Sequence, residues 1–140
     1  MAKTVLKLNE EDQFDFLLFG IICQQKDYRL CREINLKLDL QLKREEDYKV
    51  FNGKRMEDQE FSFFRYINPE EDEYYLVSNR SVKGLLIPEQ KQMDYFIIVR
   101  NGMSRIEDQT ILSAIKQIRI VLGIYKLDAK NLKSKENLVF

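Results

Sequence analysis

Two short apolar runs constrain the fold of this chain more than any other feature. Residues 16–22 are apolar at nearly every position, and the run from Met93 to Arg100 is apolar on both alternating faces. Runs of this length without a polar face are typical of strands at the centre of a sheet, where other elements cover both sides. The sequence therefore predicts a sheet with these two segments in its interior.

Two amphipathic segments predict helices that pack on this sheet. Apolar residues recur at helical spacing from Tyr28 to Leu40, and Asp27 stands where an N-cap carboxylate would accept the first free backbone N–H groups. A second apolar stripe predicts a helix over Arg105–Arg119. Ser104 and Glu107 precede it with the spacing of a capping box.

The remaining segments predict shorter strands joined by turns. The expected strands are residues 4–8, 41–51, 60–67, 74–78 and 121–127, with a tight turn at Asn52-Gly53 and an acidic hairpin loop at residues 68–72. The fold class expected is α+β: a two-layer sandwich with a mostly antiparallel sheet and two main helices on one face. The layout resembles ferredoxin-like and ACT-type domains, a likeness that implies no function. Residues 1–140 are expected to form one domain, and the tail from about residue 130 to 140 to dock on the body or on a partner.

Composition removes many classes of function. The chain contains no histidine, which excludes the commonest general base, the commonest zinc ligand and all Ser-His and Cys-His nucleophiles. It carries 23 basic and 23 acidic side chains, so no net charge attracts nucleic acid or anionic lipid. Cys23 and Cys31 are interpreted as small buried residues in a reducing compartment. With no apparent leader or spanning segment, a cytoplasmic location is expected.

One stretch of the sequence has the character of a signature. Ile87-Pro88-Glu89 is followed by three spacer residues and then by Met93-Asp94-Tyr95, directly before the second apolar run. This pattern resembles the IPExxxVDY family of small bacterial proteins, in which Val usually stands at the position of Met93. The resemblance implies membership of that family and no established activity.

The signature has a structural and a functional interpretation. In the first, Pro88 fixes the backbone, Glu89 binds a backbone N–H, Asp94 binds another or pairs with Arg100, and Tyr95 buries its ring. In the second, Glu89, Asp94 and Tyr95 line a recognition site at the mouth of a strand. An enzyme that uses Glu89 and Asp94 as an acid–base pair is a further alternative.

Three other groups of residues have the composition of candidate sites. The acidic run at residues 70–73 resembles a solvated hairpin tip more than a cation site, because it lacks spaced ligands and a turn glycine. Six aromatic residues predict one core face and a possible protein contact, with RNA stacking as the alternative: Phe61, Phe63, Phe64, Tyr66, Tyr74 and Tyr75. A basic cluster indicates a solvated surface, an acidic partner or RNA: Lys116, Arg119, Lys126, Lys130, Lys133 and Lys135.

These observations favour a non-enzymatic cytoplasmic interaction or adaptor protein that pairs with a protein partner or forms a homodimer. No catalytic residue, metal or cofactor is predicted, because no phosphate loop or dinucleotide fingerprint occurs among the five glycines. No membrane partner is expected, and nucleic acid is the least favoured partner. A small-molecule-binding regulatory domain of ACT-like layout is the alternative, and an RNA-associated protein or a carboxylate-based enzyme ranks below it.

Overall fold

The computed structural model describes residues 13–140, which form two helices, ten strands and three short 3-10 helices. The elements in chain order are β1 (Leu17–Ile22), α2 (Asp27–Leu38), β2 (Lys43–Arg44), β3 (Tyr48–Asn52), β4 (Glu57–Phe61), β5 (Phe63–Ile67), β6 (Glu73–Ser78), β7 (Arg80–Ser81), β8 (Gly84–Leu85), η1 (Pro88–Gln90), β9 (Tyr95–Arg100), α3 (Asp108–Lys116), β10 (Gly123–Leu127), η2 (Ala129–Asn131) and η3 (Lys135–Leu138). The strand expected at residues 4–8 lies outside the described residues.

Six strands form one antiparallel sheet in the order β10-β1-β9-β6-β5-β2. The two apolar runs of the sequence become β1 and β9, which are neighbours in the middle of this order. Their register places Phe19 opposite Ile97. Strands with partners on both edges and side chains covered on both faces leave no room for polar residues, which explains the unbroken apolar pattern.

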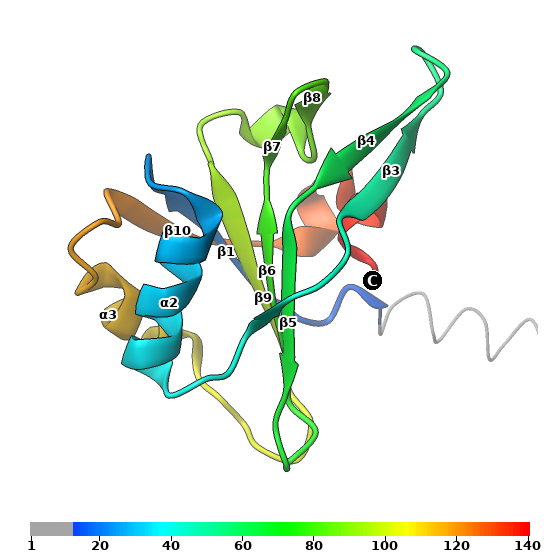
Figure 1. The fold of residues 1–140 in the computed structure, drawn as a ribbon. Coiled ribbons are helices and arrows are strands. Elements are labelled where there is room, and N and C mark those ends of the chain that lie inside the picture. The colour runs from blue at the N-terminus through cyan, green and yellow to red at the C-terminus, as the bar shows by residue number, and fades with distance from the viewer. Residues whose placement is uncertain (1–12) are drawn as a thin grey trace, which may run out of the picture.

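Both helices lie on one side of the sheet, as Figure 1 shows. The apolar faces of α2 and α3, with Leu30, Ile34, Ile111 and Ile115, pack against every second side chain of the strands. The α+β fold with helices on one face, expected from the sequence, is confirmed. The comparison with ferredoxin-like domains remains one of layout, because the segment with β2 to β5 is interposed between α2 and β6.

The opposite face of the sheet is covered without any long helix. The β3–β4 hairpin, the small β7–β8 sheet and the tail with η2 and η3 supply this cover, and a second core forms beneath them. Leu138 is fully buried in this core. The ring of Phe140 lies 4.8 Å from that of Tyr48 and 5.0 Å from that of Tyr75. The tail thus docks on the body of its own chain.

Several local predictions were wrong. Helix α3 begins at Asp108, and Glu107 at its N-cap makes no side-chain capping bond, so no capping box forms. The N-cap of α2 is Lys26, and Asp27 is its first residue, whose carboxylate accepts the N–H of Tyr28 at 2.7 Å. A single strand over residues 60–67 was also wrong, since the chain leaves β4 at Phe61 and enters β5 in a different sheet.

The turn between β3 and β4 also differs from the expected one. The pairing of Asn52 with Glu57 leaves a four-residue loop, and the positive φ falls on Met56 instead of on Asn52 or Gly53. The side chain of Asn52 stabilises the loop by accepting the backbone N–H of Lys54 at 3.0 Å. The Asn-Gly pair therefore marks the hairpin without forming the two-residue turn for which it is known.

Candidate functional site

The signature loop, residues 86–95, is organised around a buried asparagine that precedes it in the chain. The Oδ1 of Asn79 accepts the N–H of Ile87 at 2.8 Å, and its Nδ2 donates to the carbonyls of Gln90 at 3.0 Å and Met93 at 2.8 Å. Its backbone N–H donates to the carbonyl of Asp94, and its carbonyl accepts the N–H of Leu86. Asn79 is completely buried, so these bonds replace water at both ends of the loop.

Asp94 joins the loop to two other segments. One carboxylate oxygen accepts the backbone N–H of Cys23 at 2.9 Å, just past the end of β1, and the other accepts the Nε of Arg80 at 2.7 Å. The expected amide bond is therefore present, but the cation is Arg80 and not Arg100. Arg100 instead lies with its guanidinium 4.8 Å from the ring centre of Phe16.

Tyr95 buries its ring and keeps its hydroxyl bonded at the rim, as its structural interpretation requires. The hydroxyl donates to the carbonyl of Gln25 at 2.7 Å, in the connection between β1 and α2. Burial, with a smaller contribution from the negative charge of Asp27, raises the pKa of Tyr95 to about 12. A phenol held neutral in this way serves as a hydrogen-bond donor and not as a general base at neutral pH.

Glu89 binds the tail. Its two carboxylate oxygens accept the backbone N–H of Ser134 at 2.6 Å and the hydroxyl of Ser134 at 2.8 Å. Partial burial alone would raise the pKa of this carboxyl, but the hydrogen bonds from Ser134, together with those from the backbone of Glu89 and Lys133, bring the pKa below its ordinary value. An ionised carboxylate at this position holds the tail against η1.

The apolar members of the signature fill the second core. Ile87 is fully buried and Met93 nearly so. A Cβ at Gly20 of β1 would lie 2.6 Å from the Sδ of Met93, which means that the methionine side chain occupies the space above this glycine. Pro88 begins η1 at a position where its missing N–H costs no bond.

The signature thus places its two carboxylates on different partners. Glu89 faces the tail, whereas Asp94 faces the end of β1 and Arg80. Both accept backbone N–H groups, which are the contacts that a structural role requires. Sequence reasoning missed Asn79, the residue that binds the loop at three points, because a single asparagine between Ser78 and Arg80 forms no local pattern.

The acidic run at residues 70–73 is not uniformly solvated. Asp72 is completely buried, and its carboxylate accepts the Nδ2 of Asn68 at 3.0 Å and the N–H of Gly102 at 2.6 Å. Burial alone would raise the pKa of Asp72, but the hydrogen bonds from Asn68, Gly102 and Ser104 together lower it. Ser104, expected to cap a helix, therefore binds Asp72. Within residues 13–140, no three Cys, Asp or Glu side chains gather where they would hold a metal ion.

The aromatic residues belong mainly to the two cores. Phe61, Phe64, Tyr74 and Tyr75 are all buried, while Phe63 and Tyr66 are half-buried. Phe64 and Tyr74 lie on the helix side of the sheet, and Phe61 and Tyr75 on the opposite side. The set is split between two faces, so it does not form one exposed platform for stacking.

Two of the exposed apolar side chains, Leu122 and Tyr125, lie at one edge of the six-stranded sheet. Strand β10 is the terminal strand next to β1, and its outer edge has no partner strand among the described residues. Leu122 and Tyr125 there are 65% and 51% exposed. Hollows of about 410 and 420 Å³ flank them, lined in part by Leu112 of α3 and by Ile124.

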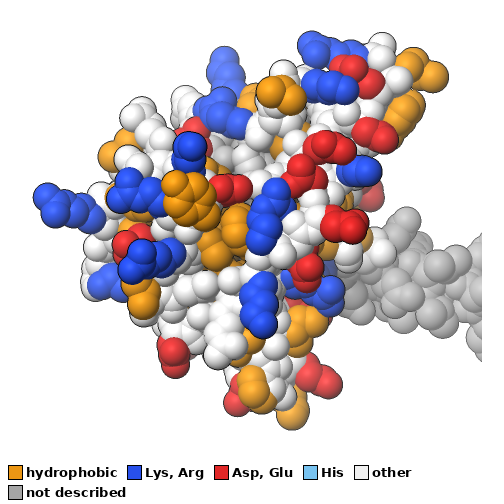
Figure 2. Space-filling view, viewed as in Figure 1, with side chains coloured by type: hydrophobic (Ala, Val, Ile, Leu, Met, Phe, Trp, Pro, Cys, Tyr) orange, Lys and Arg blue, Asp and Glu red, His pale blue; other side chains and the backbone are white. Residues whose placement is uncertain are grey.

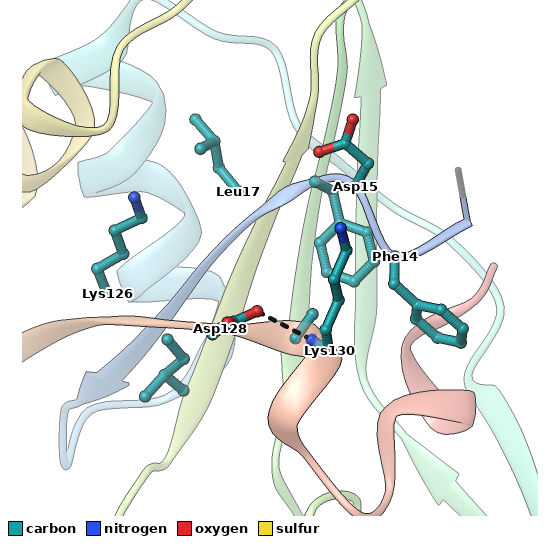
Figure 3. A pocket seen from close by; sticks show the side chains of 9 residues that line it. Phe14, Asp15, Leu17, Lys126, Asp128 and Lys130 are labelled. Carbon is teal, nitrogen blue, oxygen red and sulfur yellow. Dashed lines mark hydrogen bonds between the residues drawn. The ribbon is translucent and has the colours of Figure 1, made fainter. Parts of the chain in front are cut away.

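The two other hollows considered lie elsewhere. One of about 460 Å³ opens where β1 begins and β10 ends, and Figure 3 shows Asp15 and Lys130 among its lining residues. The only interaction drawn there joins the N–H of Lys130 to Asp128, at 3.1 Å. The other, of about 610 Å³, lies beside the β3–β4 hairpin. Of the signature residues, only Pro88 lines any of these four hollows.

The basic cluster is distributed over several elements. Lys126 of β10 pairs with Asp108 of α3 at 2.7 Å, and the Nζ of Lys135 in η3 lies 4.9 Å from the ring centre of Phe14. Cys23 and Cys31 are buried free thiols. Burial, with a smaller contribution from Asp27, raises the pKa of Cys31 to about 11, which leaves this thiol protonated and unreactive near neutral pH.

Comparisons with known proteins add no relative: no protein-family model matches the chain, and no curated protein matches it. The resemblance to the IPExxxVDY family therefore stays a prediction. Among the described residues, no helix has the length and apolar character needed to cross a membrane.

Proposed function

We propose that this protein is a non-enzymatic cytoplasmic interaction protein that pairs with a second copy of itself through the open edge of β10. The observation that carries the proposal is the unpaired edge of β10, with Tyr125 exposed within the strand and Leu122 exposed directly before it. Unpaired strand edges present rows of free N–H and C=O groups, which pair readily with another strand.

The two ends of the six-stranded sheet differ in how they are protected. At one end, β2 has only two residues, Lys43 and Arg44, both exposed and charged. Short, charged edge strands discourage pairing. At the other end, β10 has five residues, and its only charged residue is Lys126, whose ammonium is neutralised by Asp108. The β10 edge therefore lacks the protection that the β2 edge has.

A second copy fits this edge without electrostatic conflict. In an antiparallel pair centred on Tyr125, Ile124 of one copy faces Lys126 of the other, and Gly123 faces Leu127. No like charges stand directly opposite each other, and the two six-stranded sheets become continuous. The pairing buries Leu122 and Tyr125, and removal of such apolar area from water stabilises the dimer.

Sedimentation velocity of the full chain tests the proposal with a matched pair of variants. The wild-type protein should sediment at twice the 16.8 kDa mass of one chain at about 100 µM, a concentration at which a micromolar dimer is well populated. Leu122→Asp should shift it to the monomer. Leu36→Asp is the control, because Leu36 is 70% exposed on α2 and neither belongs to β10 nor lines the hollows beside it. A monomeric wild-type protein, or a dimer that survives Leu122→Asp, would refute the proposed pairing.

The second candidate function is binding of a small regulatory molecule at the same edge. The hollows of about 410 and 420 Å³ are open in one copy and would be roofed by a partner strand. Strand β9, which follows Pro88, is paired on both sides, so a subunit cannot pair with it directly. In a thermal-shift screen of amino acids and nucleotides, a ligand at 100 times its dissociation constant adds about 2.7 kcal/mol of stability. Absence of any shift counts against this function.

A further inference from the structure

A second surface lies at the other side of the molecule from β10. The β3–β4 hairpin projects from the body, and the β7–β8 sheet lies beside its base, as Figure 1 shows. Between them, with η1 and the tail, runs the groove of about 610 Å³. This groove takes residues from four separate parts of the chain, among them Phe51, Arg55, Lys83, Pro88 and Ser134.

Hydrogen bonds between these parts hold the walls of the groove. The carbonyl of Lys83 accepts both the Nε2 of Gln59 and the guanidinium of Arg55, each at 3.0 Å. Gln59 is only 7% exposed, although it is polar and lies on the hairpin. Gly84 has φ of +148°, and a Cβ there would lie 2.6 Å from the Nε2 of Gln59. The loop thus fits directly against the hairpin, so the groove exists before any partner arrives.

The tail forms the far end of the groove and is also held there by hydrogen bonds. The Nδ2 of Asn137 donates to the carbonyl of Leu86 at 2.9 Å, and Ser134 is held by Glu89 of the signature. The hydroxyl of Tyr48 on the hairpin donates to the carbonyl of Val139 at 3.2 Å. A preformed concave surface loses little conformational entropy when it binds a ligand.

The side chains that line the groove combine positive charge with apolar area. The charged ones are Lys54, Arg55 and Lys83, and no lining residue is acidic. The Nζ of Lys83 forms an ion pair with Glu57 at 3.4 Å. The net positive charge of the groove therefore comes from Lys54 and Arg55. Phe51 is 59% exposed. Figure 2 shows blue and orange side chains close together at the projecting end of the hairpin, with red acidic ones beside them.

We propose that this groove binds a short extended segment of a partner protein that combines carboxylate and apolar side chains. In an extended segment, successive side chains point to opposite sides. Acidic side chains on one side would meet Lys54 and Arg55, with Lys83 beside them, while apolar ones on the other would pack on Phe51 and Pro88. The proposal does not depend on the pairing of β10, since the two surfaces share no residue.

An acidic peptide fits the surroundings of the groove better than a nucleic acid does. Strand β4, which forms one side of the hairpin, carries Glu57, Asp58 and Glu60, the last two exposed. These carboxylates would repel a phosphate chain long enough to run past the groove. Nucleic-acid binding also depends on many neutralised phosphates, whereas this groove offers three cations in a chain of zero net charge. A short peptide stays within the positive region.

Selection from a displayed library of random twelve-residue peptides tests the proposal. The full-length wild-type chain is the bait, and a Lys54→Glu/Lys83→Gln variant is the counter-bait; Gln at position 83 avoids repulsion with Glu57. Sequences rich in Asp and Glu with one or two Leu or Phe should be enriched on the wild type only. The strongest such peptide, labelled and titrated by fluorescence anisotropy, should bind the variant about tenfold more weakly, and binding should fall with added salt.

The control is a second double variant with the same change in charge, Lys37→Gln/Lys43→Glu, whose two sites are exposed on α2 and β2. It should bind the peptide like the wild type. Thermal melts of both double variants exclude unfolding as the cause of a loss. Enrichment of basic or uncharged sequences, equal binding by all three proteins, or tight binding of a labelled ten-nucleotide RNA where no peptide is enriched would each overturn the proposal.

Discussion

Replacement of Asn79 by Ala should destabilise the protein far more than its small size suggests. The substitution removes three side-chain hydrogen bonds, of 2.8, 3.0 and 2.8 Å, between Asn79, directly after β6, and the signature loop. It leaves the N–H of Ile87 and the carbonyls of Gln90 and Met93 without these partners. Ile87 is fully buried and Met93 is 6% exposed, so bulk water does not reach them freely.

The size of the effect follows from the cost of orphaned polar groups. A buried donor or acceptor left without a partner costs about 1–3 kcal/mol, and one water molecule admitted to the vacated space recovers part of this. The carbonyl of Gln90 keeps the N–H of Met93 as a partner, so two fully orphaned groups and one weakened acceptor give a loss of about 2–5 kcal/mol. That is a large share of the roughly 5–15 kcal/mol by which domains of this size are stable. Partial unfolding of the signature loop should precede global unfolding, because the loop loses its central anchor.

Urea denaturation followed by circular dichroism measures the loss, with the slope of the unfolding free energy against urea as a check on two-state behaviour. Asn131→Ala is the matched control: Asn131 is exposed and its Nδ2 donates to Asp128 at 3.0 Å, so a change within about 0.5 kcal/mol is expected. A loss below about 1 kcal/mol for Asn79→Ala would refute the reasoning, because the loop would then hold its shape without this side chain.

Two further substitutions test other buried contacts. Asp72→Asn should lower stability by about 1–3 kcal/mol at neutral pH, since an amide cannot accept every bond that the carboxylate accepts. The carboxyl of Asp72 has a lowered pKa in the folded protein, so its contribution to stability is present above the ordinary pKa of 3.8 and is lost as the pH falls through the folded-state pKa. In urea melts, the difference in unfolding free energy between wild type and variant should therefore be smaller at pH 3 than at pH 7. An equal difference at both pH values would contradict this. Gly20→Ala should cost about 1–3 kcal/mol, because the added Cβ overlaps the side chain of Met93. When Met93→Ala is present in the same chain, most of that cost should disappear, which a double-mutant cycle measures. Additive losses of stability would contradict the overlap.

The central sheet and the helical layer were predictable because they rest on periodicity. Strands β1 and β9 are covered on both faces, and strands covered in this way have a recognisable sequence pattern, a short apolar run without a polar face. The stripes of α2 and α3 are likewise a direct consequence of one buried face. Such patterns depend only on residues that are neighbours along the chain.

Other side chains could not be placed from local patterns, because their hydrogen-bond partners lie far along the chain. Ser104 suited a capping box locally, but buried Asp72 accepts its hydrogen bond, and the helix begins later. For Asp94 the sequence offered a backbone N–H or Arg100; the backbone bond is present, from Cys23, but the cation is Arg80, which the pairing of β6 with β9 brings near. Asn79 carried no signal, because its partners lie 8 to 14 residues further along a loop with no regular pattern.

The signature and the interaction surfaces therefore have different places in this protein. Ile87 and Met93 fill the core, while Glu89, Asp94 and Tyr95 bind the tail, the end of β1 and the connection to α2. Residues used in this way hold three parts of the fold together. A variant series at Leu122 or Lys54 should change binding and leave the free energy of unfolding within about 0.5 kcal/mol of wild type, whereas changes at Asn79 should do the reverse.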